Sequence, residues 1–178
     1  MSQLPFLIAV AGFVLLLVGL AVYFLLRSRR AARNAWTLLL GRLQQIDRDN
    51  LAAVALDLLD DNDSQPQLDP DRIFEMIGGM SGLDALEQNC DVLIDLATYV
   101  QRWYPDALQV AEELRLNARE IKWHIGRLRG ASRTGHLREQ FPVYAQRAVA
   151  TYYLMTRSLL VLYEGVQLPE FADLQSAL

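Results

Sequence analysis

The stretch FLIAVAGFVLLLVGLAVYFLL, from Phe6 to Leu26, decides how the rest of this chain of 178 residues is to be interpreted. It carries no charged side chain over its whole length. As an α-helix with ~1.5 Å rise per residue it would span roughly 31 Å, about the thickness of the hydrocarbon core of a bilayer. A buried helix of a soluble protein rarely runs this far without a polar residue, so we predict a transmembrane helix over residues 6–26.

The basic residues follow the apolar run instead of preceding it, and this sets the predicted orientation. Residues 1–5 have no charged side chain, whereas four arginines lie at positions 27, 29, 30 and 33. A cleaved signal peptide would begin with basic residues and have a shorter apolar segment, so an uncleaved signal anchor is favoured. By the positive-inside rule we expect residues 1–5 outside and the bulk of the chain in the cytoplasm, at the inner (plasma) membrane.

Small residues recur along one side of the predicted span. Gly12 and Gly19 lie on a stripe with Ala9, Leu16 and Tyr23, at alternating steps of three and four residues. Small side chains allow two membrane helices to approach closely. We therefore predict that Gly12 and Gly19 face a packing partner; the alternative is that glycine is simply common in such helices.

The remainder of the chain shows helical periodicity nearly throughout and no strand-like alternation. We predict an all-α fold, in which the single transmembrane helix is followed by a cytoplasmic antiparallel bundle of about four helices over residues 27–165. A polar, proline-containing loop is predicted at 60–70, and residues 166–178 form a tail that either folds back or docks elsewhere. The sequence DRDN, Asp47 to Asn50, is either a break with a new N-cap or an exposed turn of one long helix.

Glycine and proline are expected to set the helix boundaries. Ser81 opens the sequence SGLD, an acidic variant of the capping box that begins helices. Gly130 suits a helix C-terminus, and Gly165 another. The predicted helical segments are therefore roughly Arg33 to Asp60, the short helix Asp71–Ile77, Ser81 to about Tyr104, Pro105 to Gly130, and Phe141-Pro142 to Gly165.

Charge is distributed in blocks along the chain. Residues 47–95 hold thirteen acidic residues against two arginines, whereas residues 96–157 hold ten basic residues against five acidic ones. The simplest interpretation is that acidic and basic helices are neighbours and neutralise each other. The alternative is that the basic block meets an anionic partner, such as the inner leaflet.

The search for chemical motifs finds no template for catalysis or cofactor binding. The chain has no P-loop, no dinucleotide fingerprint, no nucleophile elbow and no zinc-protease motif. It has one cysteine and two histidines, which are too few for a structural zinc site. We expect no cofactor and no metal.

The segment from Pro105 to Arg129 is predicted to be amphipathic, and a helical wheel divides its side chains into faces. A narrow buried stripe contains Val110, Leu114, Ile121, Ile125 and Leu128. One flank of this stripe contains Glu113, Asn117, Glu120 and His124. The other flank is basic and contains Arg115, Arg119, Lys122 and Arg129.

Glu120 and His124 are the pair of side chains in this helix that could form a metal-binding or catalytic site. Their E-x-x-x-H spacing occurs once and differs from the E-x-x-H pair of di-iron bundles. Catalysis by the pair would need a pocket, so the simpler prediction is an i,i+4 contact at the edge of the core. A ligand-binding or enzymatic bundle that uses Glu113, Glu120 and His124 stays open as an alternative.

Leu116 and Trp123 lie opposite the buried stripe, which gives this helix a second apolar face. Such a pair either packs against a second layer or contacts a partner. We therefore expect the chain to act, without catalysis of its own, as a scaffold, adaptor or accessory subunit of a membrane-associated complex, with a protein partner or a second copy. A regulator that binds anionic lipid through the basic flank is a further alternative. Nucleic acid is not expected, because the net charge is −4 and no nucleic-acid module is visible.

Overall fold

The computed structural model describes residues 16, 18, 19, 23, 36–59, 68–101 and 103–178. All elements of secondary structure among these residues are helices, which confirms the predicted all-α fold. The chain divides into two units, Met1–Leu38 and Leu39–Leu178. Helices α2 to α7 all belong to the second unit, which is described first.

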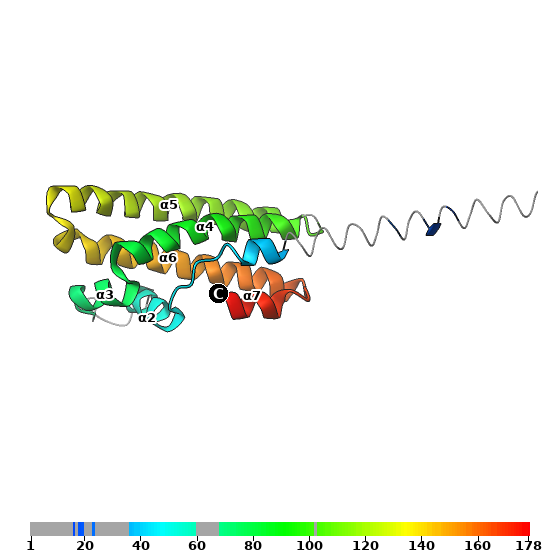
Figure 1. Cartoon of the computed structure of the whole chain (residues 1–178), viewed down its shortest axis with the longest axis horizontal. Helices are drawn as coiled ribbons and strands as arrows, with labels where there is room; N and C mark the ends of the chain where they lie inside the picture. The colour runs from blue at the N-terminus through cyan, green and yellow to red at the C-terminus, as the bar shows by residue number, and fades with distance from the viewer. Residues whose placement is uncertain (1–15, 17, 20–22, 24–35, 60–67, 102) are drawn as a thin grey trace, which may run out of the picture. The chain divides into compact units, whose positions relative to one another are not determined.

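Three long helices that lie side by side form the centre of this second unit (Figure 1). Helix α5 packs against both α4 and α6, while the shorter helices α2, α3 and α7 pack against α6. The predicted helical bundle is confirmed, but it consists of three long helices with three short ones beside them. The bounds are α2 Arg48–Leu59, α3 Pro70–Ile77, α4 Gly79–Gln101, α5 Ala107–Thr134, α6 Leu137–Gly165 and α7 Phe171–Ala177.

The apolar faces read from the sequence form the core of the bundle. Four members of the predicted stripe of α5 are buried; the fifth, Val110, is half-buried. Helix α4 contributes Leu86, Cys90, Leu93, Ala97 and Val100, and α6 contributes Val149, Met155, Leu159 and Tyr163. Side chains at steps of three and four residues point to one side of a helix, so each helix buries one stripe against the others.

The sequence DRDN proves to be a break with a new helix start. Residues 41–47 are not helical, and α2 begins at Arg48. The carboxylate of Asp47 accepts a hydrogen bond of 3.0 Å from the backbone N–H of Asn50. This is an N-cap interaction, which satisfies one of the amide groups that an α-helix leaves unpaired at its first turn.

Three of the predicted helix starts are wrong. Helix α4 begins at Gly79 instead of Ser81, and the Ser81 hydroxyl donates to the carbonyl of Gly78 inside the first turn. Gly82 allows this early start, since a Cβ there would lie 1.7 Å from the carbonyl oxygen of Ile77. Helix α5 begins at Ala107 instead of Pro105, because residues 105 and 106 form a turn. Helix α6 begins at Leu137, and Pro142 lies inside it, where its missing N–H removes one backbone hydrogen bond.

The predicted end of α5 at Gly130 is also wrong. The helix continues to Thr134 and ends at Gly135, whose φ of 79° places it in the left-handed region. Gly135 donates its backbone N–H to the carbonyl of Ala131, as expected of a left-handed C-terminal cap. Glycine at 130 costs the helix a little stability without stopping it.

The predicted transmembrane span lies largely outside the described residues. In the part of the chain that the structure describes, no helix is both long enough and apolar enough to cross a bilayer. Gly12 also lies outside that part. At Gly19, a Cβ atom would meet nothing within 4 Å.

Candidate functional site

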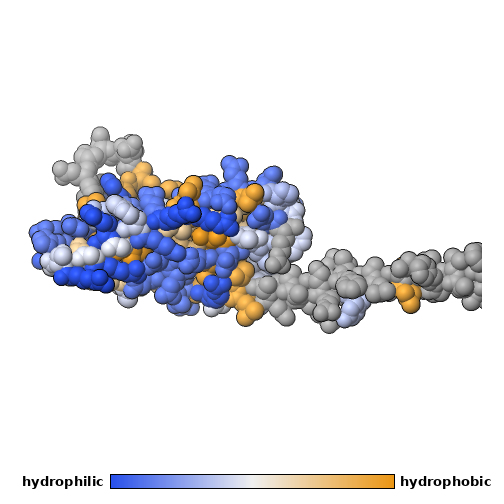
Figure 2. All heavy atoms as spheres, turned by 90° about the horizontal axis from the view of Figure 1, so that it is seen from above, coloured by the Kyte–Doolittle hydropathy of each residue, from blue (hydrophilic) through white to orange (hydrophobic). Residues whose placement is uncertain are grey.

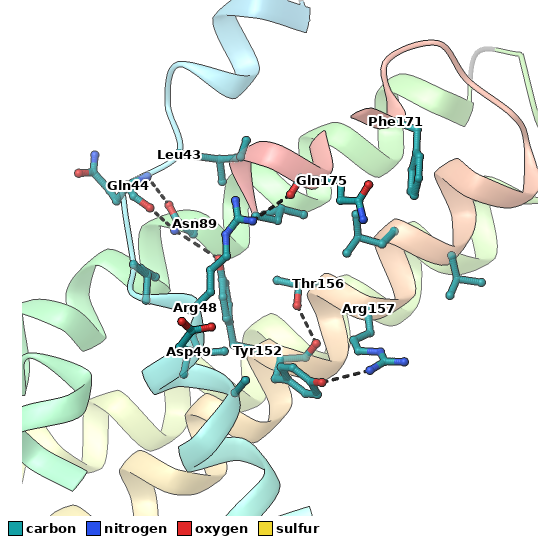
Figure 3. Close-up of a pocket in the computed structure, with 18 of the residues that line it drawn as sticks. Leu43, Gln44, Arg48, Asp49, Asn89, Tyr152, Thr156, Arg157, Phe171 and Gln175 are labelled. Atoms are coloured by element: carbon teal, nitrogen blue, oxygen red, sulfur yellow. Dashed lines mark hydrogen bonds between the residues drawn. The ribbon is translucent and has the colours of Figure 1, made fainter. Parts of the chain in front are cut away.

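A cavity of about 450 Å³ lies between the connection at residues 41–47 and helices α2, α6 and α7 (Figure 3). Its walls are partly apolar, with Leu43, Leu160 and Phe171 among the lining side chains. Two buried polar residues, Asn89 of α4 and Tyr152 of α6, also line it. A concave apolar space with a few polar groups is the usual form of a small-molecule site.

Asn89 attaches the 41–47 connection to α4. Its side chain is only 2% exposed, and its amide pairs in both directions with the backbone of Gln44. The Gln44 N–H donates to Asn89 Oδ1 at 2.7 Å, and Asn89 Nδ2 donates to the Gln44 carbonyl at 2.9 Å. The side chain thus satisfies a backbone unit that is not helical, as buried or half-buried peptide groups require.

Tyr152 extends this polar cluster into the bundle. It is 4% exposed, and its hydroxyl oxygen accepts a hydrogen bond of 3.3 Å from Asn89 Nδ2. Burial raises the pKa of Tyr152 well above its usual range, with the Asn89 hydrogen bond acting in the opposite direction. The phenol therefore stays protonated and keeps a hydrogen to donate.

Helix α7 closes one side of the cavity. Leu174 of α7 is fully buried, and the guanidinium of Arg48 donates to the carbonyl oxygens of Gln175 (2.9 Å) and Ser176. Cations at a helix C-terminus pair with carbonyls that have no partner within the helix. Residues 166–178 were predicted to be a tail that either folds back or docks elsewhere, and they fold back against the bundle.

The predicted basic flank of α5 faces the acidic helix α4. Lys122 donates to Asp91 at 2.8 Å, and Arg129 donates to Asp84 and Glu87 at 2.6 Å each. The hydrogen bond that Lys122 donates to Asp91 raises the pKa of Lys122, and the hydrogen bonds that Arg129 donates to Asp84 and Glu87 raise the pKa of Arg129. The blocks of opposite charge in the sequence thus correspond, for these residues, to neighbouring helices.

The other two members of the basic flank are placed differently. Arg115 pairs with Glu112 of its own helix and lies 3.4 Å from the Thr98 hydroxyl. Arg119 is exposed and has no ion-pair partner among the described residues. This flank therefore contains two cations paired with carboxylates of α4. Arg115 pairs within α5 and also donates to Thr98 of α4, and Arg119 faces solvent.

His124 is more deeply placed than its predicted position at the edge of the core. It is 3% exposed, and its Nε2 lies 3.5 Å from the Glu120 carboxylate. Within the described part of the chain, Nδ1 has no hydrogen-bond partner. The ring contacts both Trp123 and Tyr144, at centroid distances of 5.0 and 5.7 Å. It does not line the cavity described above.

This geometry gives little support to an enzymatic site at Glu113, Glu120 and His124. Glu113 and Glu120 are exposed while His124 is buried, so the three side chains do not converge on one solvent-accessible point. Over the described residues, no group of three or more His, Cys, Asp or Glu side chains is arranged to hold a metal. The pair of Glu120 and His124 has the geometry of a weak i,i+4 contact.

Leu116 and Trp123 are both exposed, as their positions on the helical wheel predict. Leu116 is 62% exposed and Trp123 is 56% exposed. The Trp123 ring meets Tyr144 edge-on at 5.8 Å, and the guanidinium of Arg127 lies 5.8 Å from both ring centroids. Figure 2 views the side on which α4 and α5 lie in Figure 1, where hydrophobic patches interrupt a mostly hydrophilic surface. We call Leu116 and Trp123 of α5, together with Tyr144 of the neighbouring α6, the α5 outer patch.

The cavity and its polar cluster were not predicted from the sequence. Asn89 is a polar residue next to Cys90 on an otherwise apolar helical face. A polar residue at such a position indicates a buried hydrogen-bonded group, and this is the sequence signal for the cluster. Its partner is a backbone unit 45 residues away, which no local pattern reveals.

Comparison with known proteins adds no relative: no family model, no curated protein and no solved structure matches this chain.

Proposed function

We propose that this chain is a single-pass protein of the inner (plasma) membrane, anchored by residues 6–26, with its N-terminus outside and its helical bundle in the cytoplasm. In this proposal the bundle is a scaffold, adaptor or accessory subunit of a membrane-associated complex and has no catalysis of its own. Its partner is another protein or a second copy of the chain, and it binds at the α5 outer patch.

The exposure of Trp123 is the observation that carries this proposal. Tryptophan has a large apolar surface, and residues of its kind dominate the binding energy of protein interfaces. Here the ring is held by Tyr144 and Arg127 yet stays more than half exposed. A pre-positioned aromatic side chain loses little conformational entropy when a partner covers it.

Two alternatives receive less support from the geometry. Binding of anionic lipid by the basic flank would compete with the contacts that Lys122 and Arg129 already make to α4. A reaction at Glu113, Glu120 and His124 would need the buried imidazole to reach a substrate. Both therefore rank behind a protein contact at the α5 outer patch.

Crosslinking in intact membranes, followed by purification of the full chain, tests the proposal. We expect a discrete crosslinked partner whose yield falls at least about tenfold for Trp123→Ala, because truncation of a central interface tryptophan costs about 2 kcal/mol or more. Trp103→Ala is the matched control, since Trp103 is also half exposed and also stacks on a tyrosine, Tyr99. Equal yields from the two variants would refute a partner site at the α5 outer patch.

The orientation has a separate test. A reporter that is active only in the cytoplasm, fused after residue 178, should be active, while one that is active only outside should be silent. The opposite result would overturn the topology and leave the crosslinking result to be interpreted on its own.

A further inference from the structure

The orientation of the Asn89 amide is fixed by the backbone of Gln44. A backbone N–H can only donate, so the atom 2.7 Å from it must be the Asn89 oxygen. A backbone carbonyl can only accept, so the atom 2.9 Å from it must be the Asn89 nitrogen. The side chain cannot be turned over without breaking both bonds.

This orientation determines what the Tyr152 hydroxyl can do. The Asn89 group that faces it, 3.3 Å away, is the NH₂ donor, so the hydroxyl oxygen acts as acceptor there. Its own hydrogen must then point away from Asn89, and among the described residues it has no acceptor. A buried donor without an acceptor costs free energy, so the hydroxyl is ready to pair with whatever occupies the cavity that it lines.

The rest of the lining favours an uncharged occupant. Four charged side chains reach the cavity, and they cancel: Arg48 and Arg157 against Asp49 and Glu164. Arg48 is already engaged by the carbonyls of α7, and Arg157 donates to the hydroxyl of Tyr153 at 3.1 Å. Because these four charges sum to zero, the lining as a whole attracts neither an anion nor a cation, whereas an apolar body would contact Leu43, Leu160 and Phe171.

We propose that this cavity binds a small, uncharged, mainly apolar molecule through a carbonyl oxygen that accepts the hydrogen of the Tyr152 hydroxyl. The volume of about 450 Å³ lies within the range of small-molecule sites. Figure 3 shows the elements that would enclose it, with Asn89 and Tyr152 on one side and Phe171 and Gln175 on another. The site is distinct from the α5 outer patch, since the residues of that patch do not line it.

Two probes of nearly the same shape test the proposal: acetophenone, which has a carbonyl oxygen, and ethylbenzene, which has none. Each is titrated into the full chain in detergent micelles, and the dissociation constant is taken from the shift of the Gln44 amide signal in nuclear magnetic resonance spectra. We expect acetophenone to bind about tenfold more tightly than ethylbenzene, the effect of one buried hydrogen bond.

The variant Tyr152→Phe keeps the ring and removes the donor. It should weaken acetophenone about tenfold and leave ethylbenzene within about twofold, so that the two probes become equivalent. Tyr104→Phe, which removes an exposed hydroxyl outside both the cavity and the α5 outer patch, should bind both probes like the parent chain. Partition of the probes into detergent is the same for all three chains, so the ratios between chains report on the cavity alone.

Three results would overturn the proposal. The first is equal affinity of the two probes for the parent chain, and the second is an unchanged preference in Tyr152→Phe. The third is no movement of the Gln44 signal with either probe, which would mean that water alone fills the cavity. The backbone amide signals of Ile121 and Leu128, which are buried in the core but do not line the cavity, should stay at their parent positions in the variant and so show that the fold is intact.

Discussion

Replacing Asn89 with alanine removes the side chain that attaches the 41–47 connection to α4. The variant loses hydrogen bonds of 2.7 and 2.9 Å to the backbone of Gln44 and a longer one to Tyr152. No other described side chain is in a position to replace both of the Gln44 contacts. The peptide group of Gln44 must then turn to water.

The expected cost follows from these three contacts. Each of the two short bonds contributes about 1 kcal/mol net, and the longer one less. The small space left behind adds about 1 kcal/mol, while the better helix propensity of alanine returns roughly 0.6 kcal/mol. The free energy of unfolding should therefore fall by about 2.5–3 kcal/mol.

Urea unfolding of the full chain in detergent micelles, followed by circular dichroism, measures this change. With a typical slope of about 2 kcal/mol per M urea, the midpoint should fall by about 1.3–1.5 M. Hydrogen exchange should show in parallel that the Gln44 amide loses its protection.

Asn117→Ala is the matched control. Asn117 lies on a helix, is half-buried and makes no side-chain hydrogen bond among the described residues. Its replacement brings the same gain in helix propensity without the loss of an attachment, so the midpoint should stay or rise slightly. If the two variants unfold within about 0.5 kcal/mol of each other, Asn89 does not stabilise the connection and this reasoning fails.

Two further predictions concern buried groups of the core. Burial, with a smaller contribution from Asp91, raises the pKa of Cys90 from 9.0 to about 12. The folded chain thus retains the thiol proton more strongly than the unfolded chain, and this stabilisation is complete below pH 9 and is lost as the pH rises from 9 to 12. Between pH 8 and pH 10 the parent should lose about 1.4 kcal/mol more than Cys90→Ala in urea unfolding; parallel losses would contradict the burial of the thiol. His124 has an unpaired Nδ1 and only a long contact to Glu120, so His124→Leu should change the free energy of unfolding by less than about 1 kcal/mol, whereas His124→Ala, which leaves a space, should lower it by about 2 kcal/mol. A large loss in His124→Leu would show that the imidazole makes a polar contact that the present geometry does not contain.

The helices and their buried faces were predictable because periodicity is a local property of the sequence. Leu114, Ile121, Ile125 and Leu128 recur at helical spacing, and all four are buried. The pairing of the acidic and basic blocks followed from charge alone. Helix boundaries were less predictable, since Gly130 and Gly135 have the same side chain and only the second adopts a left-handed backbone.

The cavity could not be predicted, because it depends on contacts between distant segments. Asn89 and Tyr152 lie 63 residues apart, and Arg48 meets α7 across 127 residues. The burial of His124 could not be predicted for the same reason, since it depends on a residue of another helix. Its wheel position places it beside the core, but Tyr144 of α6 also contacts its ring, and this contact cannot be seen in the sequence of α5.

The attachment of Gln44 to Asn89 also has a mechanical consequence. Tension that reaches the second unit along the chain from residue 39 meets two attachments to α4 before it reaches α2. The first is the exposed ion pair of Arg42 with Asp95, which contributes little. The second is the partly buried pair of hydrogen bonds between Gln44 and Asn89. Asn89 is thus the last described side chain of α4 that holds the connection before the load reaches α2.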